Sequence, residues 1–353
     1  MVMAKNVKVF VGLSGGVDSS VTAALLQERG YDVTGVYMKN WSQDLPGMVC
    51  PWKDDYQDAK RVAVHLNIPF KMYDFEKEYR QKVVEYMVTE YQAGRTPNPD
   101  VMCNQEIKFK LFLETALEDG ADMIATGHYA RIKDGQLLAG VDGNKDQSYF
   151  LYRVTEDALR LSLMPIGEYE KPAVRELARK YGLSTAEKKD SQGICFVGKV
   201  GIKDFLLYEL GEQAHGKIID QHSNIIGEHD GALFYTIGQR HGLDVGGGLP
   251  YYVTGKNMSK NEVHVTTDLQ DEKLWRRELS LTDVHWINDE PDFSKAYAVR
   301  IRYRALLVPV TQLERQDDKV CRGVLGEEVR AITPGQSAVM YDGDQCLGGG
   351  IVC

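Results

Sequence analysis

The sequence KVFVGLSGGVDSS, residues 8–20, decides how the first part of the chain folds. It begins as an apolar strand, makes a tight turn at Gly15 and Gly16, and continues as a helix that Gly30 is placed to end. Glycines let backbone N–H groups approach an anion closely, and the N-terminus of a helix favours negative charge. The stretch therefore predicts an anion site between a strand and a helix, with three serines adding hydroxyl donors.

The loop matches neither of two common nucleotide-binding loops. A Walker loop needs a Lys that is missing here, and a dinucleotide-binding loop needs G-x-G-x-x-G. The segment S-G-G-V-D-S-S instead resembles the pyrophosphate-binding loop of the N-type ATP pyrophosphatases, which split ATP into AMP and pyrophosphate. The alternative is an ordinary Gly-Gly turn before a capped helix, which the flanking strand and helix patterns disfavour. The resemblance implies that ATP binds at Gly12, Leu13, Ser14, Gly15, Gly16, Val17, Asp18, Ser19 and Ser20.

The length and composition of the chain predict several domains. It has 353 residues, of which 43% are hydrophobic, and about 150 residues per domain gives two or three domains. No stretch of about 18 apolar residues is present, so no membrane-spanning helix is expected. Residues 1–8 resemble neither a signal peptide nor a transit peptide, so a cytoplasmic protein is expected.

The net charge of −9 by itself argues against a nucleic-acid partner. The charge is uneven, however, because residues 293–313 contain no acidic residue and four basic ones: Lys295, Arg300, Arg302 and Arg304. Such a basic stripe can bind phosphates, or it can be the solvated face of a strand. The sequence favours neither interpretation.

Strand and helix patterns alternate through the first half of the chain. This alternation predicts an α/β fold with a doubly wound, mostly parallel sheet. Ligands of such sheets bind at the carboxyl ends of the strands, where the loop, Met38 and Gly127-His128 fall, so these residues are expected to converge on one nucleotide. Strands are predicted at residues 33–38, 70–73 and 123–128, and helices at 54–66, 76–91, 103–117 and 170–181.

Beyond about residue 201 the pattern changes to short alternating segments separated by Gly, Asn and Asp. We therefore expect a catalytic α/β domain at 1–200, a small central β-rich domain at 201–275 and a C-terminal β-barrel at 276–353. The triplets at 246–248 and 348–350 are predicted hinges or turns. Strands are predicted at residues 217–219, 233–236, 251–254, 262–265, 298–303 and 338–341.

The chain contains six cysteines, none of them in a C-x-x-C pair, which argues against a zinc ribbon or a thioredoxin motif. In a reducing cytosol they are expected to be thiols. Cys50 is interpreted as structural, and Cys321, Cys346 and Cys353 as bystanders in the β-rich part.

The segment N-P-D-V-M-C, residues 98–103, places a carboxylate three residues before a thiol. One helical turn would put Asp100 and Cys103 on the same face. A Cys in the first turn of a helix gains thiolate character, and a neighbouring carboxylate could move a proton. The alternative is a capped helix start with an inert buried Cys.

A second candidate thiol, Cys195, lies in the segment D-S-Q-G-I-C-F, residues 190–196. A polar loop and the preceding Lys188 and Lys189 favour a reactive thiolate. The alternative is a small core residue, which is the commoner role of a lone Cys.

Together, the pyrophosphate loop, the N-P-D-x-x-C segment and the D-S-x-G-I-C-F segment resemble the tRNA-specific 2-thiouridylase family. The resemblance extends from Val9 to Gly350. It implies an ATP pyrophosphatase-type α/β domain, a small central domain and a C-terminal barrel. Partners implied by the resemblance are ATP, tRNA, and a cysteine desulfurase or a sulfur-relay protein as sulfur donor, with no membrane partner.

The resemblance also implies roles for particular residues. Cys103 would be the catalytic thiol, Asp100 an acid or base, and Cys195 the carrier of a persulfide, while Met38 and Gly127 would line the adenosine site. The residues implied to contact tRNA are Asn98, Pro99, Asp100, His128, Lys145, Asp146, Gln147, Tyr303, Arg304 and Gln336.

The implied reaction is ATP-dependent 2-thiolation of the wobble uridine, in tRNAs that accept Lys, Glu or Gln. Adenylation would turn the C2 oxygen into a leaving group, releasing pyrophosphate and then AMP. Sulfur would come from the Cys195 persulfide, either as hydrosulfide after attack by Cys103 or by direct attack on the base. The first route leaves a Cys103–Cys195 disulfide that a reductant must reset. Mg²⁺ is expected with ATP because the loop itself offers no Lys.

Three alternatives remain open from the residues alone. An amide-forming ligase could use the same loop, but it would not need two thiols in polar segments. An RNA-binding protein could use ATP only as a switch, without releasing AMP. Cys103, Cys195 and Asp100 could also hold an iron–sulfur cluster, although such clusters usually need more closely spaced thiolates.

Overall fold

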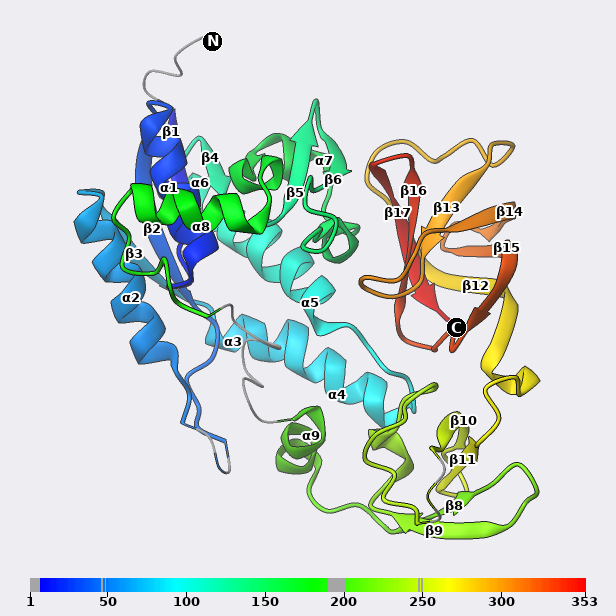
Figure 1. Cartoon of the computed structure of the whole chain (residues 1–353). Helices are drawn as coiled ribbons and strands as arrows, with labels where there is room; N and C mark the ends of the chain where they lie inside the picture. Colours follow the sequence, from blue (N-terminus) through cyan, green and yellow to red (C-terminus); the bar gives the residue numbers. More distant parts are fainter. Residues whose placement is uncertain (1–6, 46, 48, 190–200, 247, 249) are drawn as a thin grey trace.

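The computed structural model describes residues 7–45, 47, 49–189, 201–246, 248 and 250–353 (Figure 1). Over these residues the strands form a parallel five-stranded sheet, a small mixed sheet and a larger antiparallel sheet that closes into a barrel. No helix in this part of the chain is long and apolar enough to cross a membrane.

The first sheet has the order β3-β2-β1-β4-β7, and every neighbouring pair is parallel. Strand β1 lies between β2 and β4, so the strand order reverses there, and the loop after β1 lies at the point where such sheets bind ligands. The parallel sheet predicted from the sequence is confirmed. Its strands are β1 (Lys8–Gly12), β2 (Asp32–Lys39), β3 (Phe70–Asp74), β4 (Met123–Ala125) and β7 (Ser162–Leu163).

Helices cover both faces of this sheet, so the doubly wound arrangement is confirmed. Val9 and Val11 of β1 pack into one core, whereas Phe10 points to a second core on the opposite face. The first core is covered by α1 (Val17–Glu28), α2 (Trp52–His65) and α8 (Lys171–Lys180). The second is covered by α3 (Glu76–Tyr79), η1 (Arg80–Val84), α4 (Glu85–Gln92), α5 (Pro99–Met102), η2 (Cys103–Leu111) and α6 (Phe112–Glu118).

The helix that carries Cys103 begins earlier than predicted. Pro99 is its first residue, as suits a fixed φ at that position, and π-helical hydrogen bonding starts at Cys103. Cys103 therefore follows the first turn, so the prediction that it gains thiolate character from a first-turn position is wrong. The unsatisfied N–H groups of a helix N-terminus belong here to the turn that contains Asp100.

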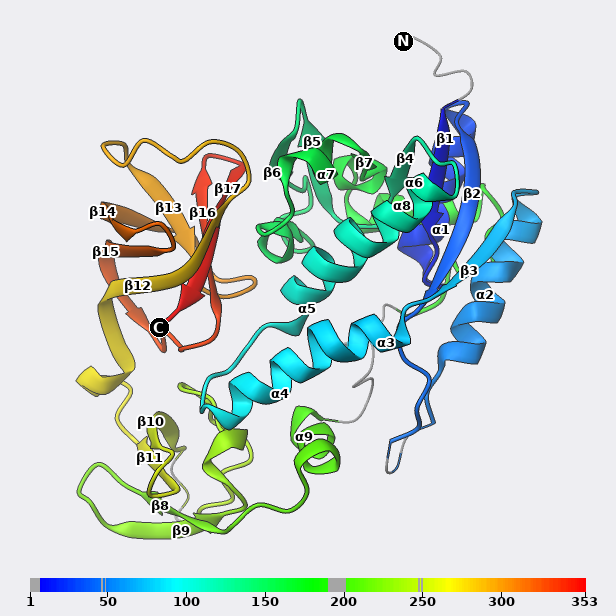
Figure 2. The same cartoon turned by 180° about the vertical axis from the view of Figure 1, so that it is seen from behind.

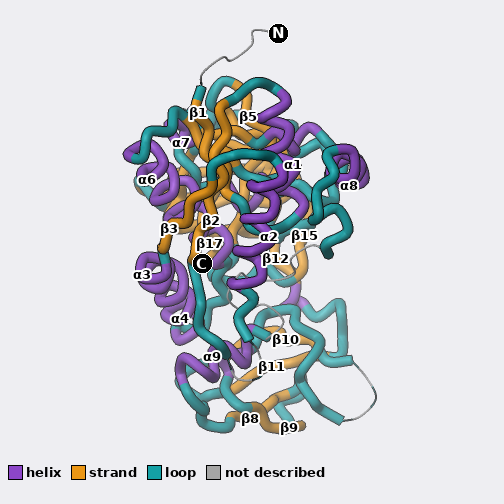
Figure 3. Tube along the Cα trace, turned by 90° about the vertical axis from the view of Figure 1, so that its left-hand side faces the viewer, coloured by secondary structure: helices purple, strands orange, loops and turns teal. Residues whose placement is uncertain are grey.

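The central sheet has the order β10-β11-β8-β9, with β11 and β8 parallel and the other pairs antiparallel. In Figure 3 it lies at the lower end of the molecule, next to α4 and α9. Its elements are α9 (Ile202–Leu210), β8 (Gly216–Ile219), β9 (Ile225–His229), β10 (Tyr252–Asn257) and β11 (Glu262–Thr266). The strand predicted at 233–236 is wrong: Ala232–Phe234 (η5) forms a helical turn, because periodicity cannot separate a short apolar strand from a buried turn.

The C-terminal strands follow the order β12-β15-β14-β13-β16-β17, and pairing of β12 with β17 closes the barrel. The predicted C-terminal barrel is confirmed. Its strands are β12 (Trp275–Trp286), β13 (Tyr297–Arg300), β14 (Val308–Asp317), β15 (Val320–Arg330), β16 (Ser337–Asp342) and β17 (Gln345–Val352).

A hairpin from the first half of the chain extends the barrel sheet. Strand β6 (Gln136–Ala139) pairs with β17, and β5 (Ala130–Lys133) pairs with β6. Figure 2 shows this hairpin between the parallel sheet and the barrel. The remaining short elements are η3 (Ser148–Leu151), α7 (Glu156–Arg160), η4 (Pro165–Glu168) and η6 (Glu272–Leu274).

Buried polar contacts add to this connection. The Arg300 guanidinium lies 2.7 Å from the Asp146 carboxylate, and the Tyr149 hydroxyl donates to the Ser337 carbonyl at 2.8 Å. Both Asp146 and Tyr149 are buried. The barrel is thus held against the α/β domain by a sheet, an ion pair and hydrogen bonds.

The glycines at 348–350 are part of strand β17, so their prediction as a hinge or turn is wrong. β17 lies between β12 and β16, and both neighbours approach its backbone closely. A Cβ on Gly348 would lie 2.2 Å from the carbonyl oxygen of His285, and one on Gly349 would lie 2.2 Å from that of Ala338. Glycine is required here for barrel closure rather than for flexibility.

We expect Gly349→Ala to destabilise the protein, because its methyl group would overlap the backbone of β16. Overpacking of this kind costs about 1–3 kcal/mol. Gly255→Ala is the matched control, since Gly255 is also in a strand and a Cβ there would meet nothing within 4 Å. Thermal and urea denaturation of both variants measures the difference. Equal midpoints for the two would show that the barrel does not depend on this close approach.

Candidate active site

The loop between β1 and α1, where the sequence predicts an anion site, is shaped by close backbone contacts. Gly16 is the N-cap residue of α1 and provides no side-chain hydrogen bond to the helix, and Gly15 has a φ of +75°. A Cβ on Gly15 would lie 2.4 Å from the carbonyl oxygen of Asp55, so glycine is required both for its conformation and for space. The Ser20 hydroxyl donates to the Gly16 carbonyl at 2.7 Å, which holds the first turn. Two of the predicted serine donors therefore support the loop, since the Ser19 hydroxyl also bonds Gly16.

Two other strand ends lie against this loop, as predicted. A Cβ on Gly127, just after β4, would lie 2.8 Å from the backbone nitrogen of Ser19. A Cβ on Gly12 would lie 2.9 Å from Cε of Met38, at the end of β2. The structure therefore brings the loop, Met38 and Gly127 together at one edge of the sheet.

The site also contains a cation that the sequence analysis missed. Nζ of Lys171, at the start of α8, lies 2.7 and 2.9 Å from the two carboxylate oxygens of Asp18. The Tyr129 hydroxyl donates to the same carboxylate at 2.8 Å. Lys171 and Asp18 are 153 residues apart, so no local pattern links them. Although the loop has no Lys of its own, folding places one beside it.

Cys195 and the segment 190–200 lie outside the described residues, so the structure does not place the predicted persulfide thiol. The residues before it are anchored near the loop: Nζ of Lys188 lies 2.9 Å from Asp55 and 2.7 Å from Asp58 on α2. After it, Phe205 of α9 packs on Trp41, which follows β2, at 6.0 Å between ring centroids. Both flanks are therefore on the side of the sheet where β1, β2 and β4 end.

The other candidate thiol is buried on the helix that starts at Pro99. Cys103 is 3% exposed, and Asp100 lies one turn before it. The barrel fixes the approach to this helix: Nε2 of Gln336 donates to the Thr96 carbonyl at 2.8 Å, and the Thr96 N–H donates to the Pro334 carbonyl at 2.9 Å. The expected tRNA contact Gln336 is thus hydrogen-bonded within the protein.

Burial sets the charge states around this helix. Burial raises the pKa of Asp100 above its usual value, and the nearby Lys108 opposes part of that rise. Burial, with help from Lys108, lowers the pKa of His128 well below its usual range. His128 is therefore neutral, and its Nδ1 contacts the Thr126 hydroxyl at 2.8 Å. A carboxyl with a raised pKa can exchange a proton near neutral pH more readily than an exposed one.

Cys50 is buried, and its thiol contacts the Trp41 carbonyl at 3.7 Å. Burial raises the pKa of this thiol, which disfavours a reactive thiolate. Its surroundings are those of a structural residue.

Among the predicted tRNA-contacting residues one is exposed, three are buried and the others are half-buried. Arg304 is exposed, adopts a φ of +62°, and donates from Nε to the Asn144 carbonyl at 3.1 Å. The centroid of the Tyr303 ring lies 4.5 Å from the centroid of the Phe150 ring. These residues lie beside the loop that carries Lys145 and Gln147. His128 and Asp146, in contrast, are buried.

The basic stripe at 293–313 does not form one exposed surface. Arg300 pairs with buried Asp146, and Arg302 donates to the Thr333 hydroxyl at 2.8 Å and to the Ala331 carbonyl at 3.2 Å. Burial lowers the pKa of Arg302. The interpretation as a solvated strand face is wrong for Arg300 and Arg302, because Arg300 pairs with Asp146 of the α/β domain and Arg302 also donates to the Ile237 carbonyl of the central domain at 3.4 Å.

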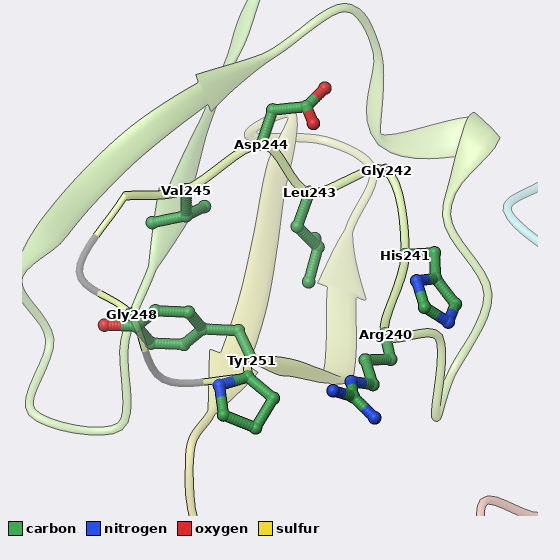
Figure 4. Close-up of a pocket in the computed structure, with 9 residues that line it drawn as sticks. Arg240, His241, Gly242, Leu243, Asp244, Val245, Gly248 and Tyr251 are labelled. Carbon is green, nitrogen blue, oxygen red and sulfur yellow. The ribbon is translucent and has the colours of Figure 1, made fainter.

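A surface pocket in the central domain lies apart from the residues discussed so far (Figure 4). It is formed by the segment 240–251 and is lined by residues that include Arg240, His241, Leu243 and Tyr251. None of the predicted site residues lines it.

Comparison with known proteins covers nearly the whole chain. Residues 7–199 match a family described as tRNA methyl transferase HUP domain, residues 203–267 its PRC-barrel domain, and residues 276–352 an aminomethyltransferase beta-barrel domain. The chain is 48% identical over 353 residues to the tRNA-specific 2-thiouridylase MnmA of Listeria monocytogenes serovar 1/2a, covering 98% of this chain and 95% of the relative. It is also 48% identical to the MnmA of Bacillus cytotoxicus, with 98% and 94% covered.

Among solved structures, the NMN synthetase of Francisella tularensis is similar over 60% of this chain and 79% of its own. The sequence identity is 17% and the TM-score is 0.37.

We expect Lys171→Met to weaken ATP binding about tenfold or more, equivalent to about 1.4 kcal/mol, because Asp18 would face the phosphates without its counter-charge. Lys180→Met is the matched control, since Lys180 is on the same helix but pairs with Glu28 at the surface. Equilibrium binding of ATP to each variant, with a thermal melt, makes the comparison. Equal affinities in the two variants would remove Lys171 from the site.

Proposed function

The chain belongs to the tRNA-specific 2-thiouridylase family, and from this membership we propose that it replaces the C2 oxygen of a tRNA wobble uridine by sulfur, using ATP. The proposal rests on the loop, Met38 and Gly127, which lie together at one edge of the sheet. They do so in a chain that is 48% identical to such an enzyme over nearly its full length. A backbone anion site and a nearby buried thiol and carboxyl are the groups that activation followed by sulfur transfer needs.

The first step activates the base. The C2 oxygen attacks the α-phosphorus of ATP, the bond to the β-phosphate breaks, and pyrophosphate leaves into the loop at the start of α1. Backbone N–H groups and the helix dipole stabilise this anion. Met38 and Gly127 are proposed to line the adenosine site.

Mg²⁺ is proposed to accompany ATP, where it would neutralise phosphate charge. Within the described residues no group of three or more His, Cys, Asp or Glu could hold a metal ion by itself. This fits an ion bound mostly through phosphates and water, with at most one or two carboxylates. Asp18 is the loop residue that would hold it, although Lys171 already contacts this carboxylate.

The second step delivers sulfur. Cys195 is proposed to carry a persulfide, and Cys103 either attacks it to release hydrosulfide or assists its direct attack on C2. The C2–O bond then breaks and AMP leaves. Both routes form a Cys103–Cys195 disulfide, because in the direct route Cys103 must attack the Cys195 sulfur to break the S–S bond that joins it to the base; an external thiol must then reduce the disulfide. Asp100 is proposed to move the proton, in keeping with its raised pKa.

The tRNA is proposed to contact the exposed part of the barrel junction. Arg304 is exposed there, and Tyr303, Lys145 and Gln147 are half-buried beside it; Asn98 with Pro99 leads toward Asp100. We propose that Asp146, His128 and Gln336 act by supporting these segments, because Asp146 and His128 are buried and Gln336 bonds Thr96.

The natural substrates are proposed to be tRNAs for Lys, Glu and Gln in the cytoplasm. A cysteine desulfurase or a sulfur-relay protein is proposed to load Cys195.

The direct test is nucleoside mass spectrometry of unmodified tRNA after incubation with the protein, ATP, Mg²⁺, cysteine and a cysteine desulfurase. A 2-thiouridine peak at the wobble position that requires ATP supports the proposal. AMP release without thiolation would mean that activation occurs with an unsuitable sulfur donor. The absence of both would contradict the proposed function.

Cys103→Ser and Cys195→Ser should each abolish thiolation and leave ATP binding intact, because a hydroxyl cannot form a persulfide or a disulfide. Cys353→Ser is the control, since Cys353 is exposed at the end of the barrel. Thiolation is measured by the same mass spectrometry and ATP affinity by equilibrium binding. Parental thiolation by either of the first two variants would exclude that cysteine from the reaction.

Arg304→Ala should weaken tRNA binding and reduce the slope of log Kd against log salt by about 1, as expected for one lost phosphate contact. Arg315→Ala is the control, because Arg315 on the same barrel is neutralised by Glu290 and Asp318. Filter binding over a salt series gives both slopes. An unchanged slope for Arg304→Ala would place its side chain away from the phosphates.

A further inference from the structure

Lys108 lies on the same helix as Cys103, one π-helical turn further along. In a π-helix the hydrogen bonds join residues i and i+5, so residue 108 follows residue 103 on the same side of the helix. Asp100 lies on the turn before. A carboxyl, a thiol and an ammonium group therefore come from successive turns of one helix.

The ammonium group of Lys108 has no carboxylate oxygen within 4.0 Å among the residues that the structure describes. Its contact is Nε2 of His128, at 3.5 Å, and it acts on Asp100 through the field of its charge. His128 is neutral, so it can accept a hydrogen bond from the ammonium but cannot balance its charge. A half-buried cation without a counter-ion is costly, which points to a charge that arrives from outside.

The neighbouring lysine on this helix has a different environment. Nζ of Lys110 lies 3.4 Å from Glu106, and its side chain is 56% exposed. Lys110 is an ordinary surface ion pair, and it provides a matched comparison for Lys108.

The location of Lys108 indicates which anion it meets. His128 directly follows Gly127, which packs on the first turn of α1, so Lys108 is linked through His128 to the loop, while its charge also acts on Asp100. In the reaction proposed above, the α-phosphoryl group must occupy the space between the pyrophosphate site and the base. That group is the anion that the base attacks.

We propose that Lys108 is a catalytic residue of the adenylation step, which donates a hydrogen bond to an oxygen of the α-phosphoryl group. This assignment rests on the proposed function. The uridine C2 oxygen forms a bond to the α-phosphorus, the bond to the β-phosphate breaks, and its electron pair leaves with pyrophosphate. The N3 proton of the base passes to Asp100. Lys108 stabilises the charge on the phosphoryl oxygens, and it keeps that contact when AMP later leaves C2.

The test isolates adenylation by using a Cys103→Ser background, in which sulfur transfer stops. Single-turnover release of pyrophosphate is measured with ATP and unmodified tRNA. Adding Lys108→Gln should slow release about 100-fold or more, as loss of one oxyanion donor does in other enzymes. Lys108→Arg should recover part of the rate, and Lys110→Gln should leave it unchanged.

The affinities for ATP and tRNA are measured for the same variants, together with their melting temperatures. A slow Lys108→Gln variant that keeps both affinities and the parental melting temperature supports the proposal. An unchanged rate of pyrophosphate release would overturn it. A slower rate would also overturn it if weaker binding of ATP or tRNA explains the whole change, or if Lys108→Gln is unfolded while Lys108→Arg is folded. If the Cys103→Ser parent releases no pyrophosphate, the proposed function itself fails, and this role fails with it.

Discussion

The close approach of two backbone segments to the start of α1 is the constraint on which the rest of this structure depends. The carbonyl of Asp55 comes too close to Gly15 to leave room for a Cβ there, and the backbone of Ser19 comes equally close to Gly127. These contacts tie α2 and β4 to the same turn, so the ends of β1, β2 and β4 are held at one point. An anion site made of backbone N–H groups can form only where side chains are absent from the approaching segments.

The barrel extends this rigidity to the helix of Cys103. Hydrogen bonds from Gln336 to the Thr96 carbonyl, and from Asn104 to the Phe150 carbonyl, fix that helix on both sides. Phe150 in turn packs on Tyr303 of the barrel. Arg300 contacts Asp146 of the α/β domain and Arg302 contacts the Ile237 carbonyl of the central domain, so these two arginines help to hold the domains together. Arg304 is the exposed exception among these three arginines.

The same packing sets the electrostatics of the site. Burial raises the pKa of Asp100, which makes its carboxylate a better proton acceptor, and lowers the pKa of His128 well below its usual range. Near the loop, Lys171 and Asp18 balance each other, whereas Lys108 has no carboxylate oxygen within 4.0 Å in the part of the chain that the structure describes. A site with a neutral imidazole and a cation without a carboxylate partner within 4.0 Å among the described residues is suited to a substrate that brings negative charge.

The sequence by itself determined the elements whose signals are local. The strand-turn-helix pattern at 8–20, the βα alternation and the strand ends at Met38 and Gly127 fixed the sheet and the place of the anion site, because periodicity and turn residues act over a few positions. Tertiary structure alone decided the role of the glycines in β17 and the inward orientation of Arg300 and Arg302. It also placed Lys171 beside Asp18, 153 residues away. Such contacts depend on which surfaces meet when the domains pack, and no short stretch of sequence carries that information.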